Sequence, residues 1–160
     1  MAKFSQAVSA LCFLSLLGFA YADSLFYVQG KVYCDTCRAQ FETKVSEYIP
    51  GAKVRLECKD REGGQPTYSI DGETDATGTY RLPVEGDHEE EICEVVLVKS
   101  SNPDCAERLP GRDRARVLVT ANNGISSAAR FANSLGFMKK EALPQCPQVL
   151  KELGIVPGAV

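Results

Sequence analysis

The sequence has no tryptophan and one histidine among its 160 residues. With His88 as its only histidine, a Ser-His-Asp triad could be built on that residue alone. Neither a Gly-x-Ser-x-Gly elbow nor a phosphate-binding glycine loop occurs. The sequence therefore lacks the usual catalytic motifs and any cofactor motif. We expect a protein that is not an enzyme, with no catalytic, cofactor-binding or metal-binding residues.

The first 22 residues have the three parts of a secretion signal. Lys3 supplies the positive charge, residues 7–19 are apolar, and Ala20-Tyr21-Ala22 places small residues where signal peptidase reads them. The apolar stretch is short for a membrane span, and no stop-transfer pattern follows it. The sequence predicts a signal peptide over residues 1–22 and one secreted domain over residues 23–160, in the extracellular space.

The charge balance is mildly acidic. The chain carries 18 Lys and Arg against 21 Asp and Glu, a net charge of −3, and loss of Lys3 with the signal makes it −4. Such a chain has no general attraction for nucleic acid or for anionic lipid. No segment after the signal is apolar enough to cross a bilayer, and no Asn-x-Ser/Thr sequon occurs. We expect no nucleic-acid partner and no membrane insertion.

Seven cysteines are present, of which Cys12 leaves with the signal. An even number in an exported chain predicts three disulfides and no free thiol. Spacing alone does not choose among their pairings. The six that remain are Cys34, Cys37, Cys58, Cys93, Cys105 and Cys146.

The run Cys34-Asp35-Thr36-Cys37 has two other interpretations. A redox pair would need a helix N-terminus in a βαβ setting to lower the pKa of one thiol. A zinc half-site would need a second cysteine pair or histidines, and only His88 is available. We favour structural cross-links, with a thiol oxidoreductase as an alternative function.

Alternating apolar and polar residues predict a series of short strands separated by turns. Residues 52–58 alternate without a fault, which points the Cys58 sulfur into the core. Residues 92–99 are almost continuously apolar, which favours a central strand buried on both faces. Six or seven such strands predict a mainly β fold, a β-sandwich or open barrel. The predicted strands cover residues 26–33, 52–58, 68–70, 80–84, 92–99 and 114–120.

Helix is predicted in two short places. Residues 38–48 carry Phe41, Val45 and Tyr48 at helical spacing. Near the C-terminus, Pro147 suits a first helical turn. The buried stripe of this last helix would consist of Val149, Leu150 and Leu153.

The residues Gln29-Gly30-Lys31-Val32-Tyr33-Cys34-Asp35-Thr36-Cys37-Arg38 resemble the signature of the olive major pollen allergen family, the Ole e I-like secreted plant proteins. The family often has proline where Ser134 stands, and many members carry a sequon that this chain lacks. The likeness covers essentially the whole mature chain. It continues through residues 47–52, 55–60, 87–94, 135–137 and 139–146.

The resemblance implies a disulfide pairing and an architecture. Its bonds would be Cys34–Cys105, Cys37–Cys146 and Cys58–Cys93, which separates the two cysteines of the C-x-x-C run. The turn before Tyr80 is also similar to that of transthyretin-like sandwich domains, so the family implies a disulfide-linked, transthyretin-like fold.

The resemblance also implies a function. Members of the family are linked to pollen and pollen-tube growth, and several are allergens. We therefore expect a monomer with a non-enzymatic binding role, its partner a cell-surface receptor or a cell-wall polysaccharide. The alternative is a protease inhibitor that presents the exposed segment Arg108-Leu109-Pro110-Gly111-Arg112.

Three surface features each have two interpretations. The acidic residues 85–91 could hold Ca²⁺, but without EF-hand spacing we favour a solvated loop. Phe137 and Met138 could contact a partner, but we favour packing against the core. A basic cluster could bind acidic polysaccharide or an acidic partner, but we favour a solvated strand edge. That cluster consists of Arg108, Arg112, Arg114 and Arg116.

Overall fold

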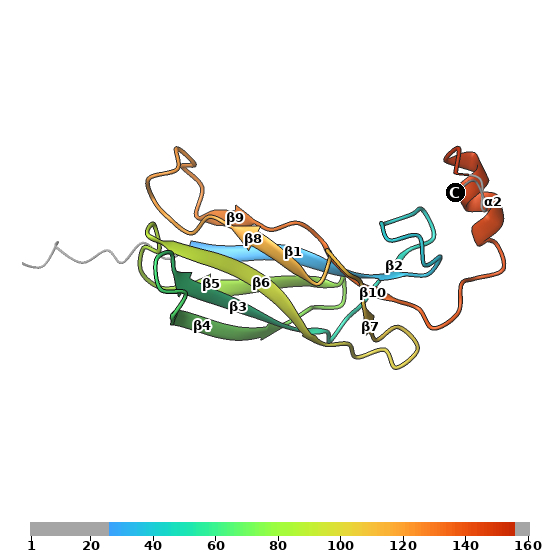
Figure 1. The fold of residues 1–160 in the computed structure, drawn as a ribbon, viewed down its shortest axis with the longest axis horizontal. Coiled ribbons are helices and arrows are strands. Elements are labelled where there is room, and N and C mark those ends of the chain that lie inside the picture. Colours follow the sequence, from blue (N-terminus) through green and yellow to red (C-terminus); the bar gives the residue numbers. More distant parts are fainter. Residues whose placement is uncertain (1–25, 156–160) are drawn as a thin grey trace, which may run out of the picture.

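The structure is a computed structural model that describes residues 26–155. The predicted signal peptide, residues 1–22, lies outside the described residues. The described part is mainly β, as predicted, with one short helix (Figure 1). Its elements are β1 (Phe26–Asp35), β2 (Glu47–Tyr48), β3 (Lys53–Asp60), β4 (Pro66–Glu73), β5 (Thr79–Val84), β6 (Glu91–Lys99), β7 (Glu107–Arg108), β8 (Arg114–Val117), β9 (Ala129–Phe131), β10 (Leu135–Met138) and α2 (Cys146–Glu152).

The strands form two sheets. One sheet has the order β2-β1-β10-β7, with β5 and β9 also paired to β1, and the other has the order β4-β3-β6-β8. The long strand β1 connects the first sheet, because its first half pairs with β5 and β9 and its second half with β2 and β10. The six predicted strands are all present, and the additional strands β2, β7, β9 and β10 have two to four residues each.

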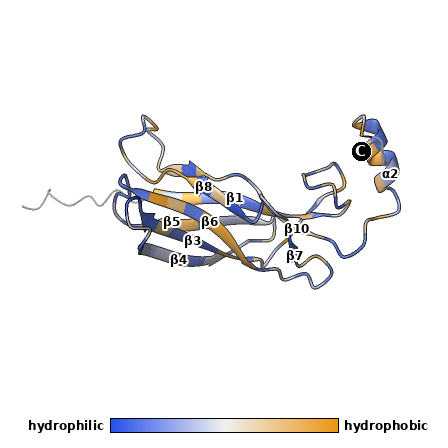
Figure 2. Cartoon of the chain, viewed as in Figure 1, coloured by the Kyte–Doolittle hydropathy of each residue, from blue (hydrophilic) through white to orange (hydrophobic). Residues whose placement is uncertain are grey.

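The two sheets share one hydrophobic core. Val28 and Val32 of β1, Leu82 of β5, and Val54 and Leu56 of β3 are fully or almost fully buried in it. Val54 and Leu56 are two residues apart, and Val28 and Val32 are four apart; even spacings of this kind put side chains on one face of a sheet. Figure 2 shows hydrophobic residues along β6 and little hydrophobic colour on β4, which is an edge strand.

Strand β6 buries one face, not both as predicted. Cys93, Val95 and Leu97 are buried, whereas Glu94 and Val96 on the other face are partly exposed. An antiparallel sheet can leave one face in water even at a central strand, since its hydrogen bonds lie in the sheet plane. The outward face consists of Glu94 and three partly exposed or exposed apolar residues, Ile92, Val96 and Val98.

Residues 38–48 are not helical, so that prediction was wrong. Arg38 and Gln40 have positive φ values of 53° and 69°, which no α-helix accommodates. The carboxylate of Asp35 accepts hydrogen bonds from the backbone N–H groups of Cys37 and Gln40. These local bonds offer the backbone an alternative to the helix that the apolar spacing suggested.

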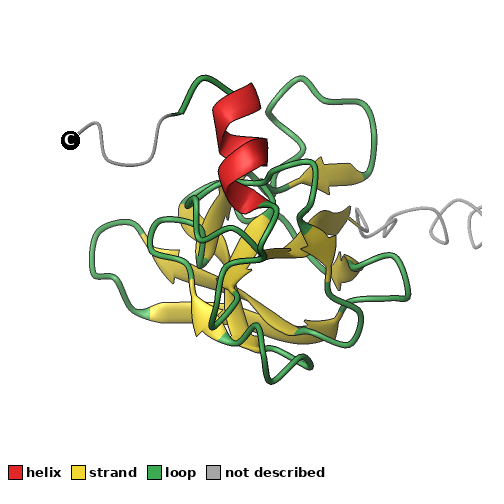
Figure 3. Cartoon of the chain, turned by 90° about the vertical axis from the view of Figure 1, so that its right-hand side faces the viewer, coloured by secondary structure: helices red, strands yellow, loops and turns green. Residues whose placement is uncertain are grey.

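The C-terminal helix forms where it was predicted. Pro147 lies in the first turn of α2 and Val149 is buried, but Leu153 is 55% exposed and lies outside the buried stripe. Figures 1 and 3 show α2 at one end of the molecule, beyond β2 and β10. No helix within residues 26–155 combines the length and the apolar character that a membrane crossing requires.

Candidate functional site

Three disulfides connect distant parts of the chain. Cys34 of β1 is bonded to Cys105, Cys37 is bonded to Cys146 of α2 across 109 residues, and Cys58 is bonded to Cys93. The last two face each other directly in the β3–β6 register. The two cysteines of the C-x-x-C run thus have different partners, and no dithiol pair exists there for exchange chemistry.

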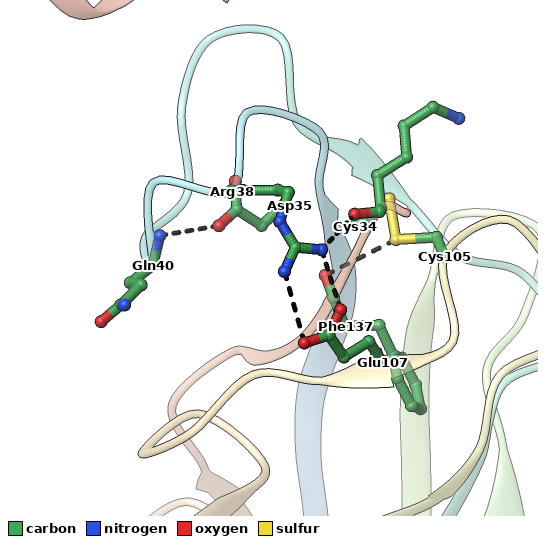
Figure 4. Close-up of polar contacts among 8 residues, drawn as sticks. Cys34, Asp35, Arg38, Gln40, Cys105, Glu107 and Phe137 are labelled. Carbon is green, nitrogen blue, oxygen red and sulfur yellow. Dashed lines mark hydrogen bonds and ion pairs between the residues drawn. A yellow bond between two sulfur atoms is a disulfide. The ribbon is translucent and has the colours of Figure 1, made fainter. Parts of the chain in front are cut away.

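The other two residues of the C-x-x-C run, Asp35 and Thr36, hold the turn in place, and Figure 4 shows the hydrogen bond between Asp35 and Gln40. The buried carboxylate of Asp35 accepts from the Cys37 N–H at 3.1 Å and from the Gln40 N–H at 2.7 Å. The hydroxyl of Thr36 donates to the Val45 carbonyl at 2.8 Å. Each side chain therefore has a hydrogen-bond partner within the fold, and these bonds fix the conformation of the C-x-x-C turn.

Arg38 connects the C-x-x-C turn to two other segments (Figure 4). Its Nη1 donates to Glu107 Oε2 at 2.8 Å and to the Lys139 carbonyl at 2.7 Å. The hydrogen bond from Arg38 lowers the pKa of the exposed Glu107 carboxyl. Arg38 thereby joins the corner after β1 to β7 and to the chain that follows β10.

His88 is almost fully buried, although the acidic residues around it are mostly exposed. Its Nδ1 lies 2.9 Å from Glu91 Oε2, and its Nε2 lies 3.0 Å from the Glu85 carbonyl oxygen. The ring centroid is 4.8 Å from that of Tyr68. Because both nitrogens face these oxygens, the ring is not placed as the base of a Ser-His-Asp triad.

The acidic loop uses its carboxylates for local structure. Asp87 Oδ2 accepts from the Ala121 N–H at 3.0 Å and from the Thr120 hydroxyl at 3.3 Å. These bonds, chiefly that from Ala121, lower the pKa of Asp87. Glu89 accepts from the Asn122 side chain. The loop is therefore tied to the segment after β8.

The structure separates the predicted basic cluster. Arg108 belongs to β7 in one sheet, whereas Arg114 and Arg116 belong to β8 in the other. Arg114 forms an ion pair with Glu94 at 2.8 Å. Arg116, two residues further along β8, is exposed on the same side of the strand.

Large apolar side chains are exposed around β8 and β9. Leu118 is 59% exposed, Ile125 is 49% exposed and Phe131 is 73% exposed. Together with Arg116 they line a pocket of about 240 Å³, and these four residues are called the β8–β9 patch below. Figure 1 shows both strands on the same side of the molecule. Exposed apolar residues that gather around a pocket mark interaction sites.

A buried arginine lines the same pocket. Arg130 is 2% exposed, donates to the Thr120 carbonyl at 2.8 Å, and lies 4.6 Å from the ring centroid of Phe26. Its Nε has no hydrogen-bond partner, and within residues 26–155 no carboxylate pairs with it. A buried cation without a counterion is costly, and Arg130 offsets part of this cost by donating to the Ser127 and Ala129 carbonyls as well.

Sequence reasoning missed the β8–β9 patch. Its apolar members are spread over a segment rich in Asn, Gly and Ser, and no periodicity links them. A single isolated apolar residue on a surface carries no information. The favoured interpretation of Phe137 and Met138 is confirmed, since both are buried.

Residues 24–154 match the family described as "Pollen protein Ole e 1 like". An "Olee1-like protein" of Betula pendula is 62% identical over 154 residues, covering 94% of this chain and 93% of its own. The "Anther-specific protein LAT52" of Solanum lycopersicum is 50% identical and covers 98% of both chains. The "Pollen allergen Che a 1" of Chenopodium album is 50% identical and covers 92% of this chain and 90% of its own.

A solved structure supports the same relationship. The crystal structure of the major plantain pollen allergen Pla l 1 is similar, with a TM-score of 0.68 at 41% sequence identity. The similarity covers 76% of this chain and 99% of that one. These relatives are named as pollen proteins and allergens, and none of these names describes an enzyme.

Proposed function

Because the chain belongs to the Ole e 1-like family of pollen proteins, we propose that it is secreted and binds a receptor ectodomain outside the cell without catalysing a reaction. The relatives supply the pollen context. The binding role and the identity of the partner are our inference, and they rest on the β8–β9 patch.

The observation that carries the proposal is the exposure of Leu118, Ile125 and Phe131 around a pocket with Arg116 at its rim. Aromatic and arginine side chains are enriched among the residues that dominate protein interfaces. Burying a side chain of this size contributes about 1.5–3 kcal/mol. Because the three side chains are already partly buried, covering what remains exposed contributes less than this for each, and Arg116 must add to it to reach a micromolar affinity, which corresponds to about 8 kcal/mol.

The chemistry of the patch favours a protein over an acidic polysaccharide. Uronic acid chains offer carboxylates but few apolar groups to cover Leu118 and Ile125. A protein loop can supply an apolar side chain for the pocket together with an Asp or Glu for Arg116 and Arg130. The split of the predicted basic cluster between two sheets also leaves no continuous arginine row for a polyanion.

The geometry does not favour the two alternative functions. Leu109, in the centre of the segment that would face a protease, is fully buried, and a hydrogen bond from Arg112 N–H to its carbonyl closes a turn there. A thiol oxidoreductase would need Cys34 and Cys37 as a pair, and each is bonded elsewhere.

Binding experiments with patch variants test the proposal. Receptor ectodomains from pollen tubes and de-esterified pectin would be immobilised side by side and exposed to the exported protein. We expect an ectodomain to bind, and Leu118→Ser or Phe131→Ser to weaken that binding at least tenfold. Leu153→Ser is the matched control, because Leu153 is similarly exposed but lies directly after α2. Binding to pectin alone, or to neither, would refute the proposal.

A charge reversal tests the electrostatic part separately. Arg116→Glu should weaken ectodomain binding and make the remaining affinity less sensitive to salt. Lys151→Glu on α2 changes the net charge equally and should have no effect. Secretion is tested by the mass of the exported protein, which should begin at Asp23.

A further inference from the structure

A second cluster of reactive side chains lies where β3 ends and β6 begins, beside β8, because Cys93 of β6 pairs with Val117 of β8. It consists of Cys58, His88, Glu91 and Cys93, and one ligand atom from each lies within 4.8 Å of the others. In the structure the two sulfurs are bonded to each other. We propose that this disulfide masks a zinc site, which forms when the Cys58–Cys93 bond is reduced.

The backbone already places the two sulfur ligands. Cys58 and Cys93 are direct partners in the β3–β6 register, so both side chains point to the same face of the sheet. Tetrahedral zinc has Zn–S bonds of about 2.3 Å and Zn–N and Zn–O bonds of about 2.0–2.2 Å. The ligand atoms around it are then about 3.3–3.8 Å apart. A cluster already within 4.8 Å needs only small shifts to reach these separations.

The other two ligands are held by hydrogen bonds of the kind that support metal sites. The Nε2 of His88 lies 3.0 Å from the Glu85 carbonyl, and donation there leaves Nδ1 with a free lone pair. Metal-binding histidines almost always donate their second nitrogen in this way. Glu91 Oε2 accepts from the Thr67 hydroxyl at 2.6 Å, which orients the carboxylate.

The same nitrogen, Nδ1 of His88, also faces the carboxylate of Glu91. Nδ1 of His88 and Oε2 of Glu91 are 2.9 Å apart, and two bare acceptors at that distance repel each other. A hydrogen or a metal ion shared between the two atoms removes this repulsion. When two thiolates join the cluster, a divalent metal is the better bridge, because it is shared by all four ligands.

The site would be closed to solvent on most sides. Both sulfurs and the imidazole are buried, and Glu91 is partly exposed at its edge. The Tyr68 ring covers His88. Four protein ligands with no open position are typical of a structural zinc site, so its role would be to keep β3 and β6 joined after the disulfide is lost.

The chemistry balances with a dithiol reductant. Its two thiols are oxidised to a disulfide, and they transfer two electrons and two protons to the Cys58–Cys93 bond, which becomes two thiols. Zn²⁺ then displaces both thiol protons and binds the thiolates. With the bond intact the sulfurs are not thiolate donors, so the oxidised protein should bind zinc weakly.

Thiol protection tests the proposal on the exported protein. It would be reduced with tris(2-carboxyethyl)phosphine with and without Zn²⁺, alkylated with N-ethylmaleimide, and mapped by mass spectrometry. We expect zinc to slow alkylation of Cys58 and Cys93 at least tenfold and to leave the other four cysteines reactive. His88→Ala and Glu91→Gln should lose this protection, whereas Glu90→Gln at the neighbouring exposed position should keep it.

Two further measurements cover the case in which the reduced chain unfolds. Zinc should then restore the β-sheet circular dichroism of the wild type but not of His88→Ala. Co²⁺ should give the visible bands of a tetrahedral thiolate site in the reduced protein and none in the oxidised protein. Equal alkylation of all six cysteines with zinc, or protection that survives His88→Ala, would overturn the proposal.

Discussion

The phenol oxygen of Tyr80 lies against the backbone of Gly30. A Cβ built at Gly30 would stand 2.2 Å from Tyr80 Oη and 2.6 Å from Cζ. The two residues are partners in the β1–β5 register, and Tyr80 is fully buried. Glycine in the family signature therefore makes room for an aromatic ring of the core.

Substitution of this glycine should destabilise the protein. Gly30→Ala forces the Tyr80 ring to move within a packed core, and overpacking of this kind costs about 1–3 kcal/mol. Urea denaturation measures the loss. Gly63→Ala is the control, because the nearest atom to its Cβ would lie at an ordinary 3.8 Å. A Gly30→Ala protein as stable as the wild type would contradict the role assigned to the ring.

Tyr80 should also make the fold sensitive to alkali. Burial raises the pKa of Tyr80, and among residues 26–155 its hydroxyl has no hydrogen-bond partner. The folded state therefore resists ionisation, whereas an unfolded tyrosine ionises near about pH 10. This contribution to stability is complete below about pH 10 and is lost as the pH rises further.

The Tyr80→Phe variant isolates this effect. It keeps the ring and removes the unpaired hydroxyl, so we expect equal or higher stability at neutral pH and a shallower loss above about pH 10. Thermal unfolding at several pH values gives the comparison. Some alkaline loss should persist, because burial also raises the pKa of Tyr33. If the variant lost stability with rising pH as steeply as the wild type, the attribution of the alkaline sensitivity to Tyr80 would be wrong.

The Cys37–Cys146 bond should be the tether of the C-terminal helix. Within α2 only Cys146 and Val149 are buried, so little apolar contact holds the helix without the bond. In a Cys37→Ala/Cys146→Ala double variant, trypsin should cleave after Lys139 or Lys140 and leave the two sheets intact. The mass of the resistant fragment measures this. Equal resistance in the variant and the wild type would show that the helix docks by itself.

Asp35 and Arg38 should differ in their effect on stability. Asp35→Ala leaves two backbone N–H groups in the C-x-x-C turn without their acceptor, which costs about 1–3 kcal/mol. Arg38→Ala breaks an exposed ion pair, and such pairs contribute about 0–1 kcal/mol. Urea denaturation of both variants compares them. If Arg38→Ala lowered the free energy of unfolding more than Asp35→Ala does, the assignment of Asp35 as the main stabiliser of the turn would be wrong.

The predicted strands were found because alternation of side chains is a local property. Residues 52–58 alternate in the sequence and form most of β3, with Cys58 facing the core as predicted. The helical spacing of Phe41, Val45 and Tyr48 misled the prediction, since local spacing does not register Asp35 bonding to the following backbone. For β6, composition could not distinguish a central strand from a strand buried on both faces.

The β8–β9 patch and the cluster around His88 could not be predicted from the sequence. Leu118, Ile125 and Phe131 meet only because β8 and β9 bring their segments together. The single His88 was assigned to a hydrophilic loop, and its burial beside Tyr68 became visible only in the structure.

The sequence by itself determined the positions of the main strands, the last helix and an even set of cysteines after residue 22, because these depend on residue identity and on neighbours a few positions away. The tertiary structure alone decided that His88 joins Cys58 and Cys93, that Arg130 is buried with no counterion in the part of the chain that the structure describes, and which apolar residues are left exposed. Those features depend on how two sheets pack, and packing brings together residues that no sequence period connects.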